Sequence, residues 1–479
     1  MNIKFKPEQM LPDLLREHPQ LRPVFDKYGL KGCGGIEGPS ESLEFFAKTH
    51  GVEPDQLYKE LTSALADTPP ELVKEHWADS IYRPFFGAGI VIALLAGAAF
   101  GTYMMFQMGV EKSVFAPGIH AMNAHAHVMV YGFIGMFVFG FGYQALPRFK
   151  HTNLKHPNLA AMSGVLLLAG LAMRFFGEFF GQTTNMSIIG TDSLGFYAAM
   201  IGTGLELLAF SMFAGILAST YRASGKKLET YDYYIIASIF WFAASLIYSG
   251  AHFWALAASD GAAQLIERVG VLQDPLRNMQ LYGAISFLIF GVFFRFLPPV
   301  FGFRNPGDKL YRWMLVVINI GLALLVGGSL LMSATKKGWV YSLDEQKAML
   351  STWRGVYSIG GLMLAGGLFT MMIGFRPWRK VSVDDRSIKF FRAAFVWMTI
   401  TLLMLLMLPV YFAIVDKGFL HGYLWGMRHA MTLGFIVMSI MAVSIKIVPT
   451  LNGIDTGKLS KLTGIFVALN VAAFVRVSV

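Results

Sequence analysis

Apolar residues occur along most of this chain in long runs that are separated by short polar loops. After about residue 84 there are eleven such runs of roughly 20 residues, the length that a helix needs to cross the hydrocarbon of a membrane. The alternating pattern of a barrel strand is missing, so the runs predict helices. The expected spans are 85–109, 122–146, 158–180, 197–220, 233–256, 277–301, 310–333, 353–375, 390–414, 425–448 and 459–478.

A motif recurs at a fixed spacing inside three of these runs. Gly132, Gly283 and Gly434 lie 151 residues apart (283 − 132 = 434 − 283 = 151), and a proline follows fifteen residues after each of them (147 − 132 = 15). The same shift places the first span on the fifth and then on the ninth, so the repeating unit has four helices around a pseudo-threefold axis. Three units need twelve helices, so either a twelfth lies outside this sequence or the third unit is truncated. The units cover about 85–232, 233–385 and 386–479.

Composition and charge agree with an all-α polytopic membrane protein. The chain is 55% hydrophobic and only 15% charged. Its net charge of +10 comes from basic residues in alternate loops, such as Arg222, Lys226 and Lys227, so we expect no nucleic-acid partner. By the positive-inside rule these loops and the N-terminus are cytoplasmic. The first 80 residues lack the apolar core of a cleavable signal, which predicts a multi-pass protein in the lipid of a bacterial-type inner membrane.

Residues 1–75 are polar and predict a small cytoplasmic domain, joined by a linker at 76–84 to the membrane part at 85–479. Their apolar spacing predicts two or three amphipathic helices around a glycine-rich turn at residues 32–35. The stretch LLREHPQLRPVFDKYGLKGCGG resembles the small redox-associated domain of ScdA-type iron-sulfur repair proteins. Cys33 is the only cysteine, which excludes intrachain disulfides and thiolate-rich metal sites. Two interpretations stay open: a reactive redox thiol, or a small residue in a tight turn.

Two histidines in the second span are the leading candidates for chemistry. His125 and His127 are two positions apart, about 200° around a helix, so they face different interhelical spaces at nearly one height. His429 occupies the repeat position of His127 (429 − 127 = 2 × 151). Two imidazoles on symmetry-related helices can serve as axial ligands of one heme iron. The sequence leaves open whether His125 or His127 faces His429, although the repeat favours His127; both can also be polar residues near the water interface.

Other polar residues inside or beside the spans are weaker candidates. Arg277 and Arg428 are 151 residues apart and suit heme propionates, or equally a role as interface anchors. Glu206 near the middle of the fourth span is either a proton relay or a hydrogen-bonded structural carboxyl. Three more histidines are expected on the outer side as metal ligands or interface residues: His120, His252 and His421.

The stretches HAHVMVYGF, RNMQLYGAISFLIFGVFFRFLPPVFGF and WGMRHAMTLGFIVMSIMAVSIKIVPTLNG resemble the NnrS family of membrane proteins. The resemblance covers about residues 82–479 and extends, more distantly, to the main subunit of heme-copper oxidases. It implies one or two b-type hemes, with copper open as a second metal, and a role in nitric oxide metabolism or resistance. It also implies a small gaseous ligand such as nitric oxide and quinol as a candidate electron donor.

This chain departs from the oxidases at the copper centre. There, histidines of the sixth and seventh helices bind copper, whereas the corresponding spans here contain no histidine. The sequence therefore predicts a heme-binding inner membrane protein that transfers electrons to a small-ligand site, and whether it is an enzyme stays open. Two alternatives remain: a non-catalytic nitric oxide sensor or carrier, and a relative of quinol oxidases or nitric oxide reductases that works with a partner subunit.

Overall fold

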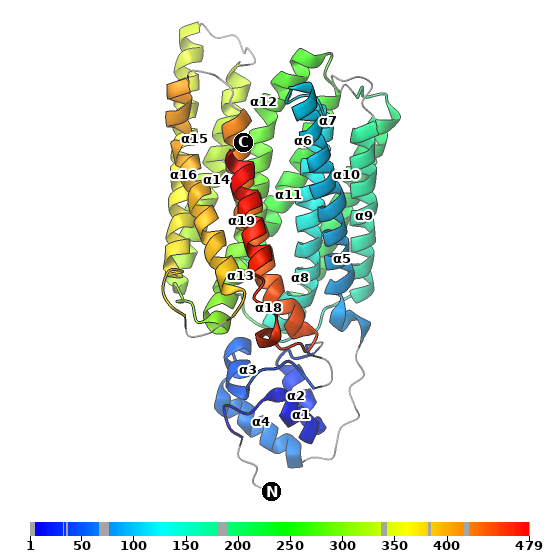
Figure 1. The fold of residues 1–479 in the computed structure, drawn as a ribbon, viewed down its shortest axis with the longest axis vertical. Coiled ribbons are helices and arrows are strands. Elements are labelled where there is room, and N and C mark those ends of the chain that lie inside the picture. Colours follow the sequence, from blue (N-terminus) through cyan, green and yellow to red (C-terminus); the bar gives the residue numbers. More distant parts are fainter. Residues whose placement is uncertain are drawn as a thin grey trace.

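The computed structural model describes residues 5–31, 33–34, 37–66, 76–180, 189–336, 343–381, 385–415 and 421–478. Within these ranges the chain forms helices and no β-strand, which confirms the predicted all-α class. Four short helices lie at one end of a long helical bundle (Figure 1). We call the end of the bundle that contacts them the proximal end and the opposite end the distal end.

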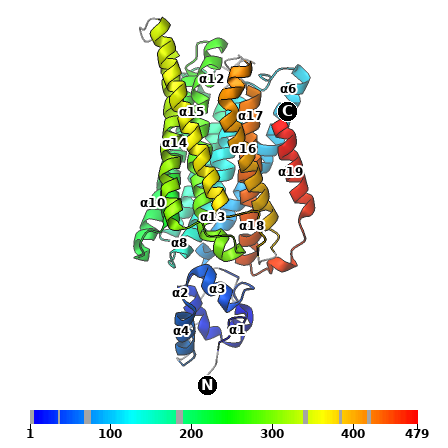
Figure 2. The ribbon, with the colours of Figure 1, turned by 90° about the vertical axis from the view of Figure 1, so that its left-hand side faces the viewer.

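Ten helices of the described residues are long and apolar enough to cross a membrane. The expected eleventh, α19, is only 16 residues long and lies at the edge of the bundle beside α17 (Figure 2). It begins at Thr463 rather than at residue 459, because the chain before it forms a short turn (η7, Thr456–Lys458) and Leu462 has a positive φ of 52°.

The spans extend further than their apolar runs at several ends. Ser193 caps α10 through its side chain, and polar residues such as Asp344 and Glu345 are included in the first turn of α15. The helices have these bounds: η2–α5–η3–α6 (Trp77–Glu111), α7–η4–α8 (Ile119–Phe149), α9 (Pro157–Phe180), α10 (Leu194–Ser224), α11 (Thr230–Ala257), α12–η5–α13 (Ala262–Phe301), α14 (Asp308–Lys336), α15 (Leu343–Gly374), α16 (Ile388–Val415), α17–η6–α18 (His421–Leu451) and α19 (Thr463–Ser478).

The 151-residue repeat is visible in the backbone. A π-helical turn interrupts the second helix of each unit, and the three turns η4, η5 and η6 begin at Val128, Met279 and Ala430, which are 151 residues apart (279 − 128 = 430 − 279). Each turn contains one of the repeated glycines, where the helix approaches a side chain of the first helix of its own unit. Such turns are uncommon and frequently occur at functional sites.

Helices α1 (Leu11–Glu17), α2 (Arg22–Lys27), α3 (Leu43–His50) and α4 (Pro54–Ala66) pack around their own apolar core. Ser42 caps the start of α3, and Gly51 ends it in the left-handed conformation with φ +66°. Tyr82 and Leu451 of the bundle join this core, and Leu451 O accepts a hydrogen bond from Gly34 N. The small helices are therefore seated directly on the proximal end of the bundle.

Candidate functional site

Polar side chains gather inside the distal half of the bundle, around α7. Helix α7 belongs to a deeply buried span and carries four polar side chains: His120, Asn123, His125 and His127. Buried polar groups of this kind need partners, so the neighbouring helices supply hydrogen-bonding side chains. His125 and His127 contact different neighbours.

His127 is held by two helices of its surroundings. Its Nε2 lies 2.8 Å from Oε2 of Glu206 on α10, and its Nδ1 lies 3.2 Å from Oγ of Ser249 on α11. Both His127 and Glu206 are almost fully buried. Glu206 Oε1 has no hydrogen-bond partner among the described residues, so this carboxylate can take a further donor. The arrangement can hold and exchange a proton between the imidazole and the carboxyl group.

The neighbouring helix α9 provides a second carboxylate, that of Glu178. Arg174 and Glu178, four residues apart on α9, form the ion pair expected from their spacing, with 3.3 Å between Nε and Oε2. Asn123 Nδ2 donates to Glu178 Oε1 at 2.6 Å, and His120 Nδ1 lies 3.4 Å from the same oxygen. We call these four residues, together with His127 and Glu206, the distal polar cluster.

The neighbourhood of the distal polar cluster retains unused hydrogen-bonding capacity. His120 Nε2 and both ring nitrogens of His252 are buried without a partner in the part of the chain that the structure describes. The charged groups that interact electrostatically with the ring of His252 include Arg174, Glu178 and Arg277. Unpartnered buried polar atoms are costly, so water or a ligand is the expected partner here.

His125 points to the other side of α7. Its Nδ1 lies 2.8 Å from Ala96 O in η3, and its ring approaches Gly101 on α6. His429, the last residue of α17, has its Nδ1 2.8 Å from the carbonyl oxygen of Trp425, four residues earlier on its own helix. In both residues the carbonyl fixes the ring as the Nδ1–H tautomer, so that Nε2 keeps its lone pair.

The two arginines of the repeat lie inside the bundle and already have partners. Arg277 is buried and donates to Gln280 Oε1 at 2.8 Å and to Asn123 Oδ1 at 3.3 Å. Arg428 binds the carboxylate of Asp274 with 3.2 Å between Nη2 and Oδ1. Their guanidinium groups therefore join neighbouring repeats.

The imidazoles of His125 and His429 are donors of a kind that can bind a heme iron. Two imidazoles with carbonyl-bound Nδ1 atoms suit axial ligation of a heme iron. No group of three or more His, Cys, Asp or Glu side chains that could hold a metal ion occurs among the residues that the structure describes. The side chain of His421 lies outside the described residues.

Cys33 lies at the opposite, proximal end of the molecule. Its side chain is buried, and burial raises the pKa of the thiol, whereas the nearby Arg148 acts in the opposite direction. The structure therefore gives the thiol a cationic neighbour, and its redox role stays a prediction.

Some residues of the site had not been singled out from the sequence. Asn123 and Asp274 bind the two repeat arginines and are themselves 151 residues apart (274 − 123), so the repeat contained a signal for them. Ser249 and Gln280 carried no comparable signal, because a buried serine or glutamine is common in polytopic helices.

A comparison with protein families finds one that matches most of the chain. The model of the family described as NnrS protein matches residues 78–479, which include the whole bundle and exclude α1–α4. A search of curated proteins finds no match.

Proposed function

This chain belongs to the NnrS family, and from that premise we propose that it is a heme-binding membrane protein of nitric oxide metabolism or resistance. The family makes it a membrane protein related to nitric oxide. The finer proposal is that it holds heme b between α7 and α17 and passes electrons, with quinol as the donor, to a small ligand.

The observation that carries this proposal is that both His125 and His429 direct Nδ1 to a main-chain carbonyl. Each imidazole has its Nδ1 bound to a main-chain carbonyl at 2.8 Å, and neither Nε2 makes a hydrogen bond to the described residues. Such a carbonyl fixes the orientation of a ligating ring and raises its basicity. A heme held there by both imidazoles would supply electron transfer.

We assign the axial role to His125 rather than to His127. The two nitrogens of His127 already have partners in Ser249 and Glu206, so ligation through either atom would break a buried hydrogen bond. His125 contacts neither Glu206 nor Ser249, and its only polar contact among the described residues uses Nδ1, so its Nε2 is available as a ligand.

In this proposal the distal polar cluster manages protons. His127 and Glu206 share a hydrogen bond, and Glu206 Oε1 is available to a further donor. Reduction of a small nitrogen oxide consumes protons as well as electrons, so a buried pair that exchanges a proton suits that task. Glu206 then has the role of a positioning and relay group.

The same histidine pair also supports the alternative of a non-catalytic carrier or sensor. A heme held by both His125 and His429 would supply electron transfer or sensing rather than catalysis at an open iron. A spectral shift with carbon monoxide in the reduced protein would distinguish an accessible centre from a closed one.

The test is the heme content of three alanine variants of the purified full chain. We expect His125→Ala and His429→Ala each to lose or broaden the low-spin reduced absorption bands, and His127→Ala to retain them. Iron and copper counts on the same samples show whether copper is present at all. Retention of normal bands in both His125→Ala and His429→Ala would contradict the shared-heme proposal.

A further inference from the structure

A cavity of about 120 Å³ lies at the proximal end of the bundle, under the N-terminal helices. Its walls come from the ends of α8, α13 and α18, which are the second helices of the three repeats, and its cover comes from the segment between α2 and α3 and from α3 itself. The space corresponds to roughly four water molecules of liquid volume. It therefore has room for a small ligand together with water.

The cavity lies on the pseudo-threefold axis. Gln144, Arg295 and Lys446 all line it, and they are equivalent positions of the repeat (295 − 144 = 446 − 295 = 151). Arg148, one helical turn further along α8, lines it as well. The repeat has thus placed two positive charges at equivalent positions of one ring, and Arg148 adds a third from the next turn.

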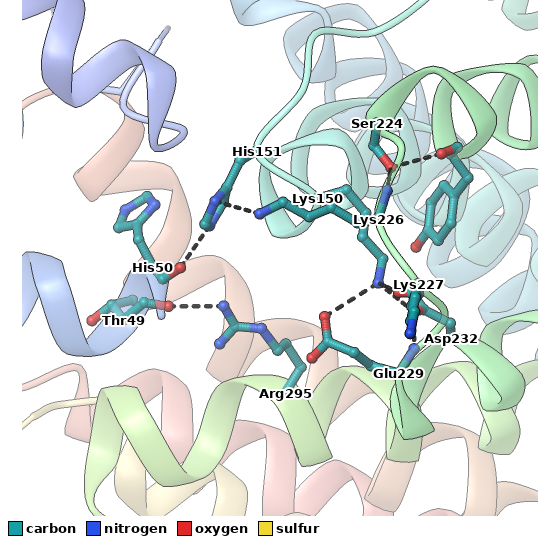
Figure 3. A network of polar contacts seen from close by, with 11 residues as sticks. Thr49, His50, Lys150, His151, Ser224, Lys226, Lys227, Glu229, Asp232 and Arg295 are labelled. Atoms are coloured by element: carbon teal, nitrogen blue, oxygen red, sulfur yellow. Dashed lines mark hydrogen bonds and ion pairs between the residues drawn. The ribbon is translucent and has the colours of Figure 1, made fainter. Parts of the chain in front are cut away.

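Two of these cations have no carboxylate partner among the described residues. Arg295 donates to Thr49 O at 3.1 Å, as Figure 3 shows, and its guanidinium lies over the ring of Phe149. Arg148 donates to Lys31 O at 3.0 Å and to Asp79 O at 3.2 Å. Carbonyl oxygens satisfy the N–H groups of these arginines and leave their positive charges uncompensated.

The two other charged groups of the lining, Lys446 and Glu41, change the net positive charge of the cavity little. Lys446 is already paired with Asp385 at 3.4 Å. Glu41 lines the cover of the cavity, and burial raises its pKa to about 8, so this carboxyl group is mostly uncharged at neutral pH. The cavity is therefore electropositive, although most of its surface is hydrocarbon.

We propose that this axial cavity binds a small, weakly hydrated monovalent anion between Arg148 and Arg295, next to the thiol of Cys33. An anion neutralises the uncompensated guanidinium charges. Hydrocarbon walls penalise strongly hydrated anions such as sulfate or phosphate more than weakly hydrated ones, and guanidinium is itself weakly hydrated. Water carried with the anion also provides a donor for Gln144 Oε1, which is buried without a partner in the described part of the chain.

The class of anion follows from the cavity alone. The more specific proposal that the anion is nitrite or nitrate, the oxyanions formed when nitric oxide is oxidised, rests on the proposed function. The N-terminal helices cover the site, so binding also couples the small domain to the bundle.

Cys33 provides the test, because it is the only thiol in the chain and lines the cavity. The purified full chain is treated at pH 7, where Glu41 is mostly uncharged, with two thiosulfonate reagents of similar size, one anionic and one trimethylammonium. A control variant, Cys33→Ser/Ser63→Cys, carries a single exposed thiol. The rate of each reagent with Cys33 is divided by its rate with this exposed thiol, which corrects for the different intrinsic reactivity of the two reagents. We expect about a tenfold preference for the anionic reagent. Sodium nitrate should slow its reaction, and sodium sulfate of equal ionic strength should not.

Two variants separate binding from nonspecific charge. Arg295→Gln installs the residue found at the equivalent position 144, and we expect it to abolish both the preference and the protection. Arg222→Gln removes an exposed cation outside the cavity and should change neither. Equal normalised rates, or nitrate protection that survives Arg295→Gln, would overturn the proposal. If Cys33 reacts with neither reagent, calorimetric titration with nitrate decides, and absence of heat rejects the site.

Failure of this test is distinguishable from failure of the heme proposal. The thiol measurement needs no heme, and the His125→Ala variant should retain the anion preference. Conversely, Arg295→Gln should retain the absorption bands of any bound heme.

Discussion

Arg428 binds Asp274 across the boundary between the second and third repeats, with 3.2 Å between Nη2 and Oδ1. Arg277 binds Asn123 in the same way across the boundary between the first and second repeats. The two arginines are 151 residues apart (428 − 277), and so are their two partners (274 − 123). The same contact therefore occurs twice in the repeat. The pair is thus a property of the repeat and joins successive units head to tail.

The third copy of this contact is missing. It would connect residues 126 and 425, which are Ala126 and Trp425, and alanine has no donor for it. The boundary between α7 and α17 therefore lacks the arginine link, and His125 and His429 come from the two helices at that boundary. At this boundary a different arginine, Arg476 of α19, lies over the ring of Trp425.

The first prediction concerns Asp274 as the partner of Arg428. Asp274→Asn keeps an amide oxygen for the arginine but turns Nδ2 toward Asn278, which donates to Oδ2 of Asp274 at 3.0 Å, so we expect a loss of about 1 kcal/mol in unfolding free energy. Asp274→Ala leaves a partly buried guanidinium without its partner and should cost about 2 to 3 kcal/mol. Equilibrium unfolding in detergent measures both; equal losses for the two variants would show that the contact is not used as described.

The second prediction concerns the close packing of a repeated glycine. A Cβ added at Gly434 would lie 2.4 Å from Cγ of Trp397. Gly434→Ala should therefore destabilise the bundle by about 1 to 3 kcal/mol. The control is Gly366→Ala on α15, where no described atom lies within 4 Å of the new Cβ, and where a gain of up to about 1 kcal/mol is expected from helix propensity. Similar melting temperatures for the two variants would contradict the packing argument.

The fold was predictable because two independent regularities of the sequence agree. Apolar runs fixed the helices to within a few residues at most ends, and the 151-residue spacing fixed their order in four-helix units. The π-helical turns at Val128, Met279 and Ala430 were not predictable, since they depend on packing between helices. Helix α19 was predicted to start at residue 459, four residues too early (463 − 459), because its apolar run includes residues that precede the helix.

The candidate site was predictable in its residues but not in their pairing. His125, His127 and His429 stand out because histidine is rare inside a span. The contact of His127 with Glu206 joins residues from helices that no local pattern connects. The repeat favoured His127 as the partner of His429, whereas we propose His125, because both ring nitrogens of His127 already have partners in Ser249 and Glu206.

The third prediction concerns a buried lysine at the proximal end, drawn in Figure 3. Lys150 Nζ lies 2.5 Å from Asp232 Oδ2 and 3.2 Å from Glu229 Oε1, and both Lys150 and Asp232 are fully buried. Lys150→Met leaves a buried carboxylate without its cation and should cost about 3 to 5 kcal/mol of unfolding free energy. The double variant Lys150→Met/Asp232→Asn should recover more than half of that loss. A double variant no more stable than the single one would refute the pairing.

The last prediction is that docking of the N-terminal helices weakens in acid. His151 Nδ1 accepts from Lys226 Nζ at 2.6 Å, and its Nε2–H donates to His50 O at 2.6 Å (Figure 3), so the ring is neutral when the helices are docked. Burial lowers the pKa of His151, and it lowers the pKa of His50 to about 3. Undocked imidazoles titrate near 6.5. The stabilisation of docking by these two neutral rings is therefore complete above about pH 6.5. It is lost as pH falls toward the pKa values that the rings have in the docked state.

Glu41 acts with the opposite sign, which supplies the control. Its pKa is raised from 4.5 to about 8 by burial, so its contribution is complete below about pH 4.5 and is lost as pH rises through 8. Hydrogen exchange of the Gly34 amide, which bonds Leu451 O across the junction, reports docking. We expect protection to fall on both sides of a maximum near pH 6 to 7. His151→Gln should reduce the acid loss and Glu41→Gln the alkaline loss; protection that is flat from pH 5 to 8.5 in the full chain would exclude both roles.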